Sequence, residues 1–397
     1  MIPPRPFQLS RLPRIHFGTG QIQALPALVA AQGSRLLLIT SRTAFPASPH
    51  FQALLDGLRA AGLHWHHETV SGEPSPATVD ALVARYHGMG LELVVGIGGG
   101  SVLDAAKAVA GLLPSGDSVM DYLEGVGRGR PYQGPALPFI AVPTTAGTGS
   151  EATKNAVLSV IGPEGFKKSF RDERLVPVDA VVDPALLATC PKPLLAANAL
   201  DALTQLIESY VSSRAHAVSD ALARDGIARL GQGLFPALED NSQAAAGRTA
   251  LAYGALLSGI TLAQAGLGAV HGLASPLGAF FPIPHGVVCG RLLAPCTAVN
   301  LQALRDRAPD HPALGKYADV ARLLSGRDHP DPGAATNALV KLLEDWTRRV
   351  SLPRLGDFRL RSADFPKIIA HSRGSSMKTN PVVLTDAELH QALEQAL

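Results

Sequence analysis

The sequence predicts an α/β layer with a parallel sheet, followed by an all-helical domain. Up to about residue 188, short and almost continuous apolar runs alternate with amphipathic helical segments, as in parallel sheets covered by helices on both faces. Beyond Asp183 the β-branched apolar runs stop, and only a helical period remains. The chain has 397 residues, and this length favours two domains of roughly 150–200 residues each.

The first domain is predicted from runs that end in Gly, Pro, Ser or Thr. The predicted buried strands are residues 35–40, 91–98, 137–145 and 178–184. Helical patterns intervene, for example over residues 48–62 and 75–88. The segment HWHHE (64–68) resembles a metal-binding tract, but its alternation is typical of an edge or half-exposed strand.

The domain boundary is predicted near residues 184–192, where Pro191 and Pro193 interrupt the helical pattern. We therefore expect an α/β domain over residues 1–187 and an all-helical domain over residues 188–397.

The composition is typical of a folded soluble protein, with 46% hydrophobic and 17% charged residues and a net charge of +2. There is no basic stripe and no run of 18 apolar residues, and because residues 1–20 lack an apolar h-region and a small-residue cleavage site we expect that they are not a secretion signal. The three cysteines are odd in number and widely spread, which argues against a disulfide framework. We expect a cytoplasmic protein with no nucleic-acid or membrane partner.

Two loops predict a nucleotide site in the first domain. Gly98, Gly99, Gly100 and Ser101 separate an apolar strand from an amphipathic helix, so backbone N–H groups at the helix start are open to a pyrophosphate. A loop rich in Ser and Thr, residues 142–155, follows the next strand. Ligands of open α/β sheets bind at the carboxyl ends of the strands, so both loops should face the same crevice.

The helical domain contains polar residues within unusually apolar sequence segments. Asp201 and Gln205 are four residues apart, so they project from one face of a helix. His271 and His285 are each followed by glycine, and the segment between them carries no charge. A histidine in such a segment is most often a core residue, and the alternative is a metal ligand.

Five ordered segments resemble the iron-containing (group III) alcohol dehydrogenase family. They are GIGGGSVLDAAKAVA, PTTAGTGSEATKNAVLS, LDALTQLIESYVS, AVHGLASPLGAFFPIPHGVVCGRLL and SSMKTNPVVLT. The resemblance covers residues 14 to 390. It implies a dehydroquinate synthase-like architecture, with an N-terminal dinucleotide-binding domain and a C-terminal helical domain. It also implies NAD(P)-dependent interconversion of small alcohols with aldehydes or ketones, in a homodimer or a higher homo-oligomer.

The resemblance implies a metal, Fe²⁺ or Zn²⁺, held by one aspartate and three histidines. The aspartate matches Asp201, two histidines match His271 and His285, and the third matches Gln205. The glutamine is similar to that of one branch of the family, and its carboxamide oxygen is a poorer ligand than imidazole. Ser275 stands where many members carry a further histidine. By the same match, Asp201, His271 and His285 are the catalytic candidates.

The resemblance also implies a set of cofactor-binding residues. They are Ser41, Gly98, Gly99, Gly100, Ser101, Thr144, Thr145, Thr148, Asn155 and Lys167. Lys167 matches less securely, because its loop aligns loosely. Ser41 lies where NAD-preferring members have aspartate, and Ser41 with Arg42 could accommodate a 2′-phosphate, so the cofactor is NAD or NADP.

Other functions stay open at this point. A metal-independent reductase of the maleylacetate type would share the fold, although its histidine-rich segment differs from HGLASPLG. A dehydroquinate synthase would need several cationic side chains for its substrate, and residues 201–290 contain four arginines and no lysine. Gln205 and Ser275 are the features that favour a nucleotide-binding protein without catalysis.

Overall fold

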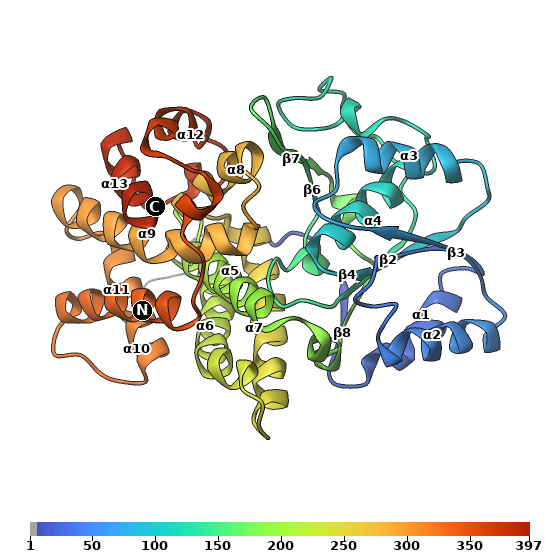
Figure 1. Cartoon of the computed structure of the whole chain (residues 1–397), viewed down its shortest axis with the longest axis horizontal. Coiled ribbons are helices and arrows are strands. Elements are labelled where there is room, and N and C mark those ends of the chain that lie inside the picture. The colour runs from blue at the N-terminus through green and yellow to red at the C-terminus, as the bar shows by residue number, and fades with distance from the viewer. Residues whose placement is uncertain (1–5) are drawn as a thin grey trace. The chain divides into compact units, whose positions relative to one another are not determined.

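The computed structural model describes residues 6–397, and they divide into two compact units, each with its own core (Figure 1). The α/β unit comprises Ser10–Val160 and Lys167–Pro191. The helical unit comprises Lys192–Leu397, with Ile161–Phe166 and the N-terminal segment that ends at Leu9.

The α/β unit is built on a six-stranded sheet with the order β1-β8-β5-β4-β2-β3. Every neighbouring pair is parallel. The strands are β1 (Arg14–Phe17), β2 (Arg35–Ser41), β3 (His64–Val70), β4 (Leu93–Gly98), β5 (Phe139–Pro143) and β8 (Asp179–Val182). The four predicted apolar runs form the central strands β2, β4, β5 and β8, and the histidine-rich run forms the edge strand β3. The predicted fold class is confirmed.

Helices cover both faces of this sheet. They are α1 (Leu25–Ala30), α2 (Pro49–Ala60), α3 (Pro76–Tyr86) and α4 (Gly100–Leu112). Figure 1 shows α1 and α2 on one side of the sheet and α3 and α4 on the other. Leu36 and Leu38 of β2 pack with Leu54 and Leu58 of α2 in one core cluster. Burying each of these side chains contributes about 1.5–3 kcal/mol to stability.

The sequence patterns did not predict a second, two-stranded sheet. It consists of β6 (Asn155–Val160) and β7 (Phe166–Arg171). Three residues of β6 but only one of β7 are buried, and β7 reads FKKSFR, so neither strand has the continuous apolar run that marked the central strands. The four-residue strand β1 was missed for the same reason.

The helical unit is arranged around one buried helix. Its helices are α5 (Lys192–Val211), α6 (Ala217–Leu238), α7 (Ala244–Ala265), α8 (Ala269–Phe280), α9 (His285–Arg307), α10 (Pro312–Ser325), α11 (Pro332–Arg349), α12 (Phe365–His371) and α13 (Asp386–Ala396). Helix α5 is buried along nearly all of its length and packs against α6, α7, α9 and α10. A side chain on α5 is therefore presented to several other helices at once.

Helix α9 is also apolar and largely internal. Among residues 6–397 it is the one helix long and apolar enough to cross a membrane, and 83% of its most apolar stretch is buried inside the structure. Helices α7 and α8 would pass the same test only as a single span, and they are bent by 102°.

Candidate functional site

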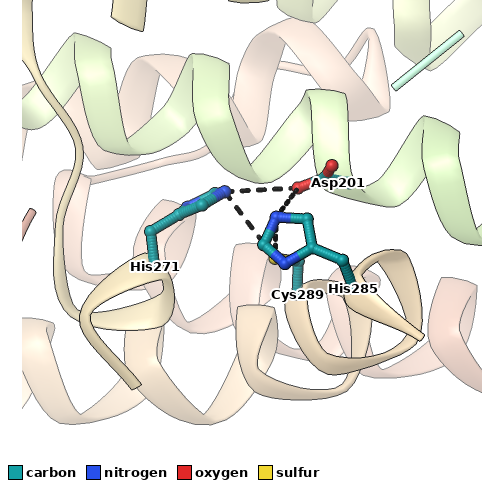
Figure 2. Close-up of side chains that lie close together, drawn as sticks. All are labelled: Asp201, His271, His285 and Cys289. Atoms are coloured by element: carbon teal, nitrogen blue, oxygen red, sulfur yellow. Dashed lines mark hydrogen bonds and ion pairs between the residues drawn. The ribbon is translucent and has the colours of Figure 1, made fainter. Parts of the chain in front are cut away.

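Four potential metal ligands from three helices converge inside the helical unit. Asp201 comes from α5, His271 from α8, and His285 and Cys289 from α9 (Figure 2). His271 Nε2 lies 3.2 Å from Asp201 Oδ1, and His285 Nε2 lies 3.7 Å from the same oxygen. Cys289 Sγ lies 3.6 Å from each of the two Nε2 atoms. The structure thus brings together the three residues that the sequence singled out as catalytic candidates.

Glycine and proline allow these helices to meet. Between α8 and α9, Pro282 and Pro284 prevent one continuous helix, and α9 begins at His285 itself. Gly286 follows, and a Cβ atom there would lie 2.8 Å from the carbonyl carbon and oxygen of Ala197 on α5. Only glycine permits this close approach of α9 to α5, which sets His285 beside Asp201.

Glu208 holds the ring of His271. Its Oε2 lies 2.6 Å from His271 Nδ1, and its Oε1 accepts a hydrogen bond of 2.7 Å from the backbone N–H of Val270. A carboxylate on Nδ1 keeps the proton at that atom, so Nε2 presents its lone pair to a metal. Glu208 lies two helical turns beyond Asp201 on α5, and the three side chains form one chain of contacts.

Gln205 also lies buried on α5, in the place that the resemblance gives to a third histidine. Its Oε1 accepts a hydrogen bond of 2.7 Å from the hydroxyl of Ser258 on α7. The same hydroxyl also lies 2.8 Å from the Ala255 carbonyl, so its single proton is shared, and at most one of the two lone pairs of the carboxamide oxygen is used.

The site stabilises positive charge. Burial opposes ionisation of Asp201, but the charges of His285 and His271 and the hydrogen bond from His271 outweigh it and lower the pKa of Asp201 to about 2. Burial alone would lower the pKa of His271, but the interactions with Cys289, Glu208 and Asp201 raise that pKa well above its usual value. The surroundings of His271 are therefore less apolar than its own segment indicates, because α5 contributes two carboxylates.

The thiol and the second histidine differ in exposure. Burial and the nearby charge of Asp201 raise the pKa of the Cys289 thiol to about 12, so it is protonated while no cation is beside it. The side chains of Asp201 and His271 are 1% and 7% exposed, whereas that of His285 is 25% exposed. His285 is therefore the most exposed of the four residues, since Cys289 is fully buried.

The residues fit a divalent ion. One donor atom from each of Asp201, His271, His285 and Cys289 lies within 4.8 Å of the other three. The second carboxylate oxygen, Asp201 Oδ2, is buried and has no hydrogen-bond partner among the described residues. An unpaired buried carboxylate oxygen is costly, and a cation at this point would offset the cost.

In the α/β unit, the two predicted nucleotide loops lie against each other. The N–H of Thr144 donates to the carbonyl of Gly98 at 2.9 Å. A Cβ atom on Gly99 would lie 3.3 Å from the Thr145 side chain, and one on Gly100 would lie 2.6 Å from Thr148 Oγ1. The loops meet at the carboxyl ends of β4 and β5, as the sequence predicted.

The start of α4 has the features of a phosphate site. Gly99 is its N-cap residue, and no side chain caps the helix. Ser101 follows in the first turn. The N–H groups of Val102 and Leu103 donate to the Gly99 carbonyl, so those of Gly100 and Ser101 are the ones open to another acceptor, and the helix dipole favours a negative one.

The remaining predicted cofactor residues lie in different settings. Ser41 ends β2, next to β4 in the sheet, and its hydroxyl accepts a hydrogen bond of 3.1 Å from the N–H of Phe45. Asn155 opens β6, half-buried. Lys167 on β7 forms an ion pair of 2.5 Å with Glu73.

Lys107 is a buried residue that the sequence did not single out. Its ammonium group donates to the Ser150 carbonyl at 2.8 Å and to the Asn155 carbonyl at 2.7 Å, and it also bonds the hydroxyls of Ser150 and Thr153. It thereby ties the second loop to α4. Burial lowers the pKa of Lys107 to about 8, although Asp104 and Glu151 favour its charge.

Two further residues at the site, the potential ligand Cys289 and the His271 partner Glu208, were not among the predicted site residues. Cys289 is four residues after His285, so PHGVVCG already placed the thiol on the same helix face. Glu208 is seven residues after Asp201, again on one face. Helical spacing could have found both residues, but only tertiary structure shows that they reach His271.

The sequence matches two family descriptions along nearly its whole length. Residues 13–184 match "Iron-containing alcohol dehydrogenase", and residues 195–397 match "Fe-containing alcohol dehydrogenase family, C-terminal".

Curated relatives and solved structures agree with these matches. "Alcohol dehydrogenase 4" of Saccharomyces cerevisiae (strain YJM789) is 32% identical over 96% of each chain. "Lactaldehyde reductase" of Escherichia coli (strain K12) is 31% identical over 89% of each chain. A crystal structure of 1,3-propanediol oxidoreductase superposes with a TM-score of 0.87 at 28% identity, covering 99% of this chain and 100% of that one.

Proposed function

The chain belongs to the iron-containing alcohol dehydrogenase family, and we propose that it transfers hydride between NAD or NADP and a small alcohol or aldehyde. It is an alcohol dehydrogenase, an oxidoreductase acting on alcohols and aldehydes. The observation that carries the proposed mechanism is the convergence of Asp201, His271 and His285.

The glycine loop and the threonine loop would hold the cofactor. The pyrophosphate would lie at the uncapped start of α4, over Gly98, Gly99, Gly100 and Ser101. Thr144, Thr145 and Thr148 would contact the nucleotide and the nicotinamide, with Asn155 and Lys167 near the phosphates or ribose. The nicotinamide supplies or accepts the hydride when bound.

Ser41 bears on the choice of cofactor. It lies at the carboxyl end of β2, where an acidic residue would bind the ribose diol of NAD. Serine leaves room for a 2′-phosphate, so both cofactors are candidates. The Ser41→Asp substitution should lower kcat/KM for NADPH relative to NADH, because the new carboxylate would repel the 2′-phosphate.

Asp201, His271 and His285 would hold Fe²⁺ or Zn²⁺. The ion, when bound, supplies Lewis-acid polarisation of the substrate oxygen. Asp201 provides the negative charge that favours a cation, and Glu208 orients His271. Gln205 lies at the position where the resemblance implies a further ligand, and its Oε1 accepts a hydrogen bond from the Ser258 hydroxyl.

Small alcohols and aldehydes are the proposed substrates. The names of the relatives include lactaldehyde reductase and 1-propanol dehydrogenase, and the apolar residues Leu262, Phe280 and Phe281 lie close in sequence to the histidines. We also propose that the protein is a cytoplasmic homo-oligomer, a homodimer or larger, with no nucleic-acid or membrane partner.

The test mixes the metal-loaded protein with NADH or NADPH and a panel of small aldehydes, and repeats the assay after chelation. We expect cofactor oxidation that chelation abolishes and that added metal restores. Oxidation at full rate in protein shown to be free of metal would instead establish a metal-independent reductase, in which His271 or His285 donates the proton.

A further inference from the structure

We propose that the Cys289 thiolate is the fourth protein ligand of the metal site, so that this chain binds its ion with one carboxylate, two imidazoles and one thiolate. The inference rests on the proposed metal-dependent function and concerns which side chain replaces the family's third histidine. The ligand would come from α9, whereas Gln205 lies on α5.

The distances between donor atoms support a tetrahedral ion. A tetrahedral zinc ion has bonds of about 2.1 Å to nitrogen and oxygen and about 2.3 Å to sulfur. Two of its ligand atoms are then about 3.4 Å apart when they are nitrogen and oxygen, and about 3.6 Å apart when they are nitrogen and sulfur. The observed nitrogen–oxygen distances are 3.2 Å and 3.7 Å, and both nitrogen–sulfur distances are 3.6 Å. The thiol therefore stands at the separation that a ligand requires.

The position of Cys289 on its helix explains why the sulfur is fixed there. It is four residues after His285 on α9, so the two side chains project from the same face. The residue is fully buried, and Asp201 faces it from α5 (Figure 2). Cys296 is buried on the same helix, and neither Cys296 nor Cys190 is in the group of converging ligands.

Gln205 is a weaker candidate for the fourth position. A neutral carboxamide oxygen binds Fe²⁺ or Zn²⁺ poorly, and this one already accepts a hydrogen bond from Ser258. A thiolate carries a full charge and binds zinc strongly. The chain thus has a stronger donor beside the two histidines than at the position matching the family's third histidine.

Binding would exchange a proton for the ion. The S–H bond of Cys289 breaks, its proton goes to solvent, and the electron pair of the thiolate forms the bond to the metal, with no change of oxidation state. Because thiolate is a soft ligand, this set should favour Zn²⁺ over Fe²⁺ more than a set of one aspartate and three histidines does.

Cobalt(II) substitution tests the proposal without any activity assay. The metal-free protein is titrated with Co²⁺, and its absorption is recorded against that of the Cys289→Ser and Cys296→Ser variants. We expect a thiolate-to-cobalt charge-transfer band in the near ultraviolet for the wild type and for Cys296→Ser, and none for Cys289→Ser. Bound cobalt without such a band in the wild-type protein would overturn the proposal and leave the metal-dependent function intact.

Zinc affinity provides a second measurement and a rescue. Loss of a direct ligand should weaken Zn²⁺ binding at least as much as loss of an outer partner does, so we expect about a 100-fold or larger loss in Cys289→Ser. The double variant Cys289→Ser with Gln205→His should recover part of this affinity while still lacking the cobalt band. Unchanged zinc affinity in Cys289→Ser would contradict the proposal. Failure of the wild-type protein to bind either ion would refute the metal site as a whole.

Discussion

His271 is the most constrained side chain of the site, because Glu208 and Asp201 lie at its two ring nitrogens. Glu208 contacts Nδ1 and would not itself touch the ion, yet this contact decides which ring nitrogen of His271 is free to bind a metal. The carboxylate thus acts on the metal through the histidine.

The substitution Glu208→Gln should therefore lower metal affinity by about 10–100-fold, because the charged partner of His271 Nδ1 is lost. Competition with a chelator of known affinity measures the change. Glu344→Gln, on the exposed face of α11, serves as the control and should leave affinity unchanged. Equal affinities in the two variants would show that Glu208 only supports the fold.

The lowered pKa of the buried Lys107 predicts that the stability of the α/β unit depends on pH. Its pKa is lowered from 10.5 to about 8 by burial, so between these values the unfolded chain holds a proton that the folded one has lost. The free energy of unfolding should then rise with pH across this window, by up to about 3 kcal/mol from this group. Lys107→Met should lack that rise.

Denaturant unfolding at pH 8 and pH 10 checks this expectation, followed by Trp65 fluorescence in a Trp346→Phe background. Trp65 lies in β3, so it reports on the α/β unit. Parallel pH profiles in the presence and absence of Lys107 would contradict the assigned titration.

Among the helices, the junction of α8 and α9 determines the position of His285. The prolines end one helix and begin the next, and Gly286 lets the first turn of α9 touch the backbone of α5 at Ala197. Helix packing at this distance tolerates no side chain.

A Gly286→Ala substitution should move the start of α9 away from α5. We expect a loss of about 1–3 kcal/mol in stability and at least a tenfold loss of metal affinity, because His285 would shift with the helix. Gly315→Ala is the matched control, since a Cβ atom there meets nothing within 4 Å and alanine favours helix. Isothermal titration with Zn²⁺ and thermal unfolding of both variants make the comparison.

The sequence predicted the four strands whose residues are buried on both sides, and it predicted the exposed edge strand β3 from its alternation. Strands β2, β4, β5 and β8 are continuous apolar runs, whereas β1, β6 and β7 are short or partly exposed and carry no such pattern. For the site, the family resemblance supplied Asp201, His271 and His285. The contributions of Cys289 and Glu208 depend on the packing of α5 against α8 and α9, which no local pattern encodes.

For the whole molecule, the two compact units should each gain stability from a different ligand, the α/β unit from the cofactor and the helical unit from the metal. The chain has two tryptophans, Trp65 in β3 of the α/β unit and Trp346 in α11 of the helical unit. A ligand that binds only the folded state stabilises the unit that holds it.

Oxidised cofactor at 100 times its Kd should raise the free energy of unfolding reported by Trp65 by about 2.7 kcal/mol. Metal at 100 times its Kd should raise the free energy of unfolding reported by Trp346 by the same amount. Single-tryptophan variants, Trp346→Phe and Trp65→Phe, separate the two signals in thermal or denaturant unfolding. A cofactor effect confined to Trp346 would contradict the assignment of the nucleotide site to the α/β unit.

The most direct measurement is a stepwise titration of metal-free protein with Zn²⁺ or Fe²⁺, in which bound metal and NAD(P)H-dependent aldehyde reduction are recorded on the same samples. Activity should rise in proportion to bound metal and reach its plateau at one equivalent per chain, and Asp201→Asn should show neither. Full turnover in samples that contain no metal, or metal binding that leaves turnover unchanged, would contradict a catalytic ion at Asp201, His271 and His285.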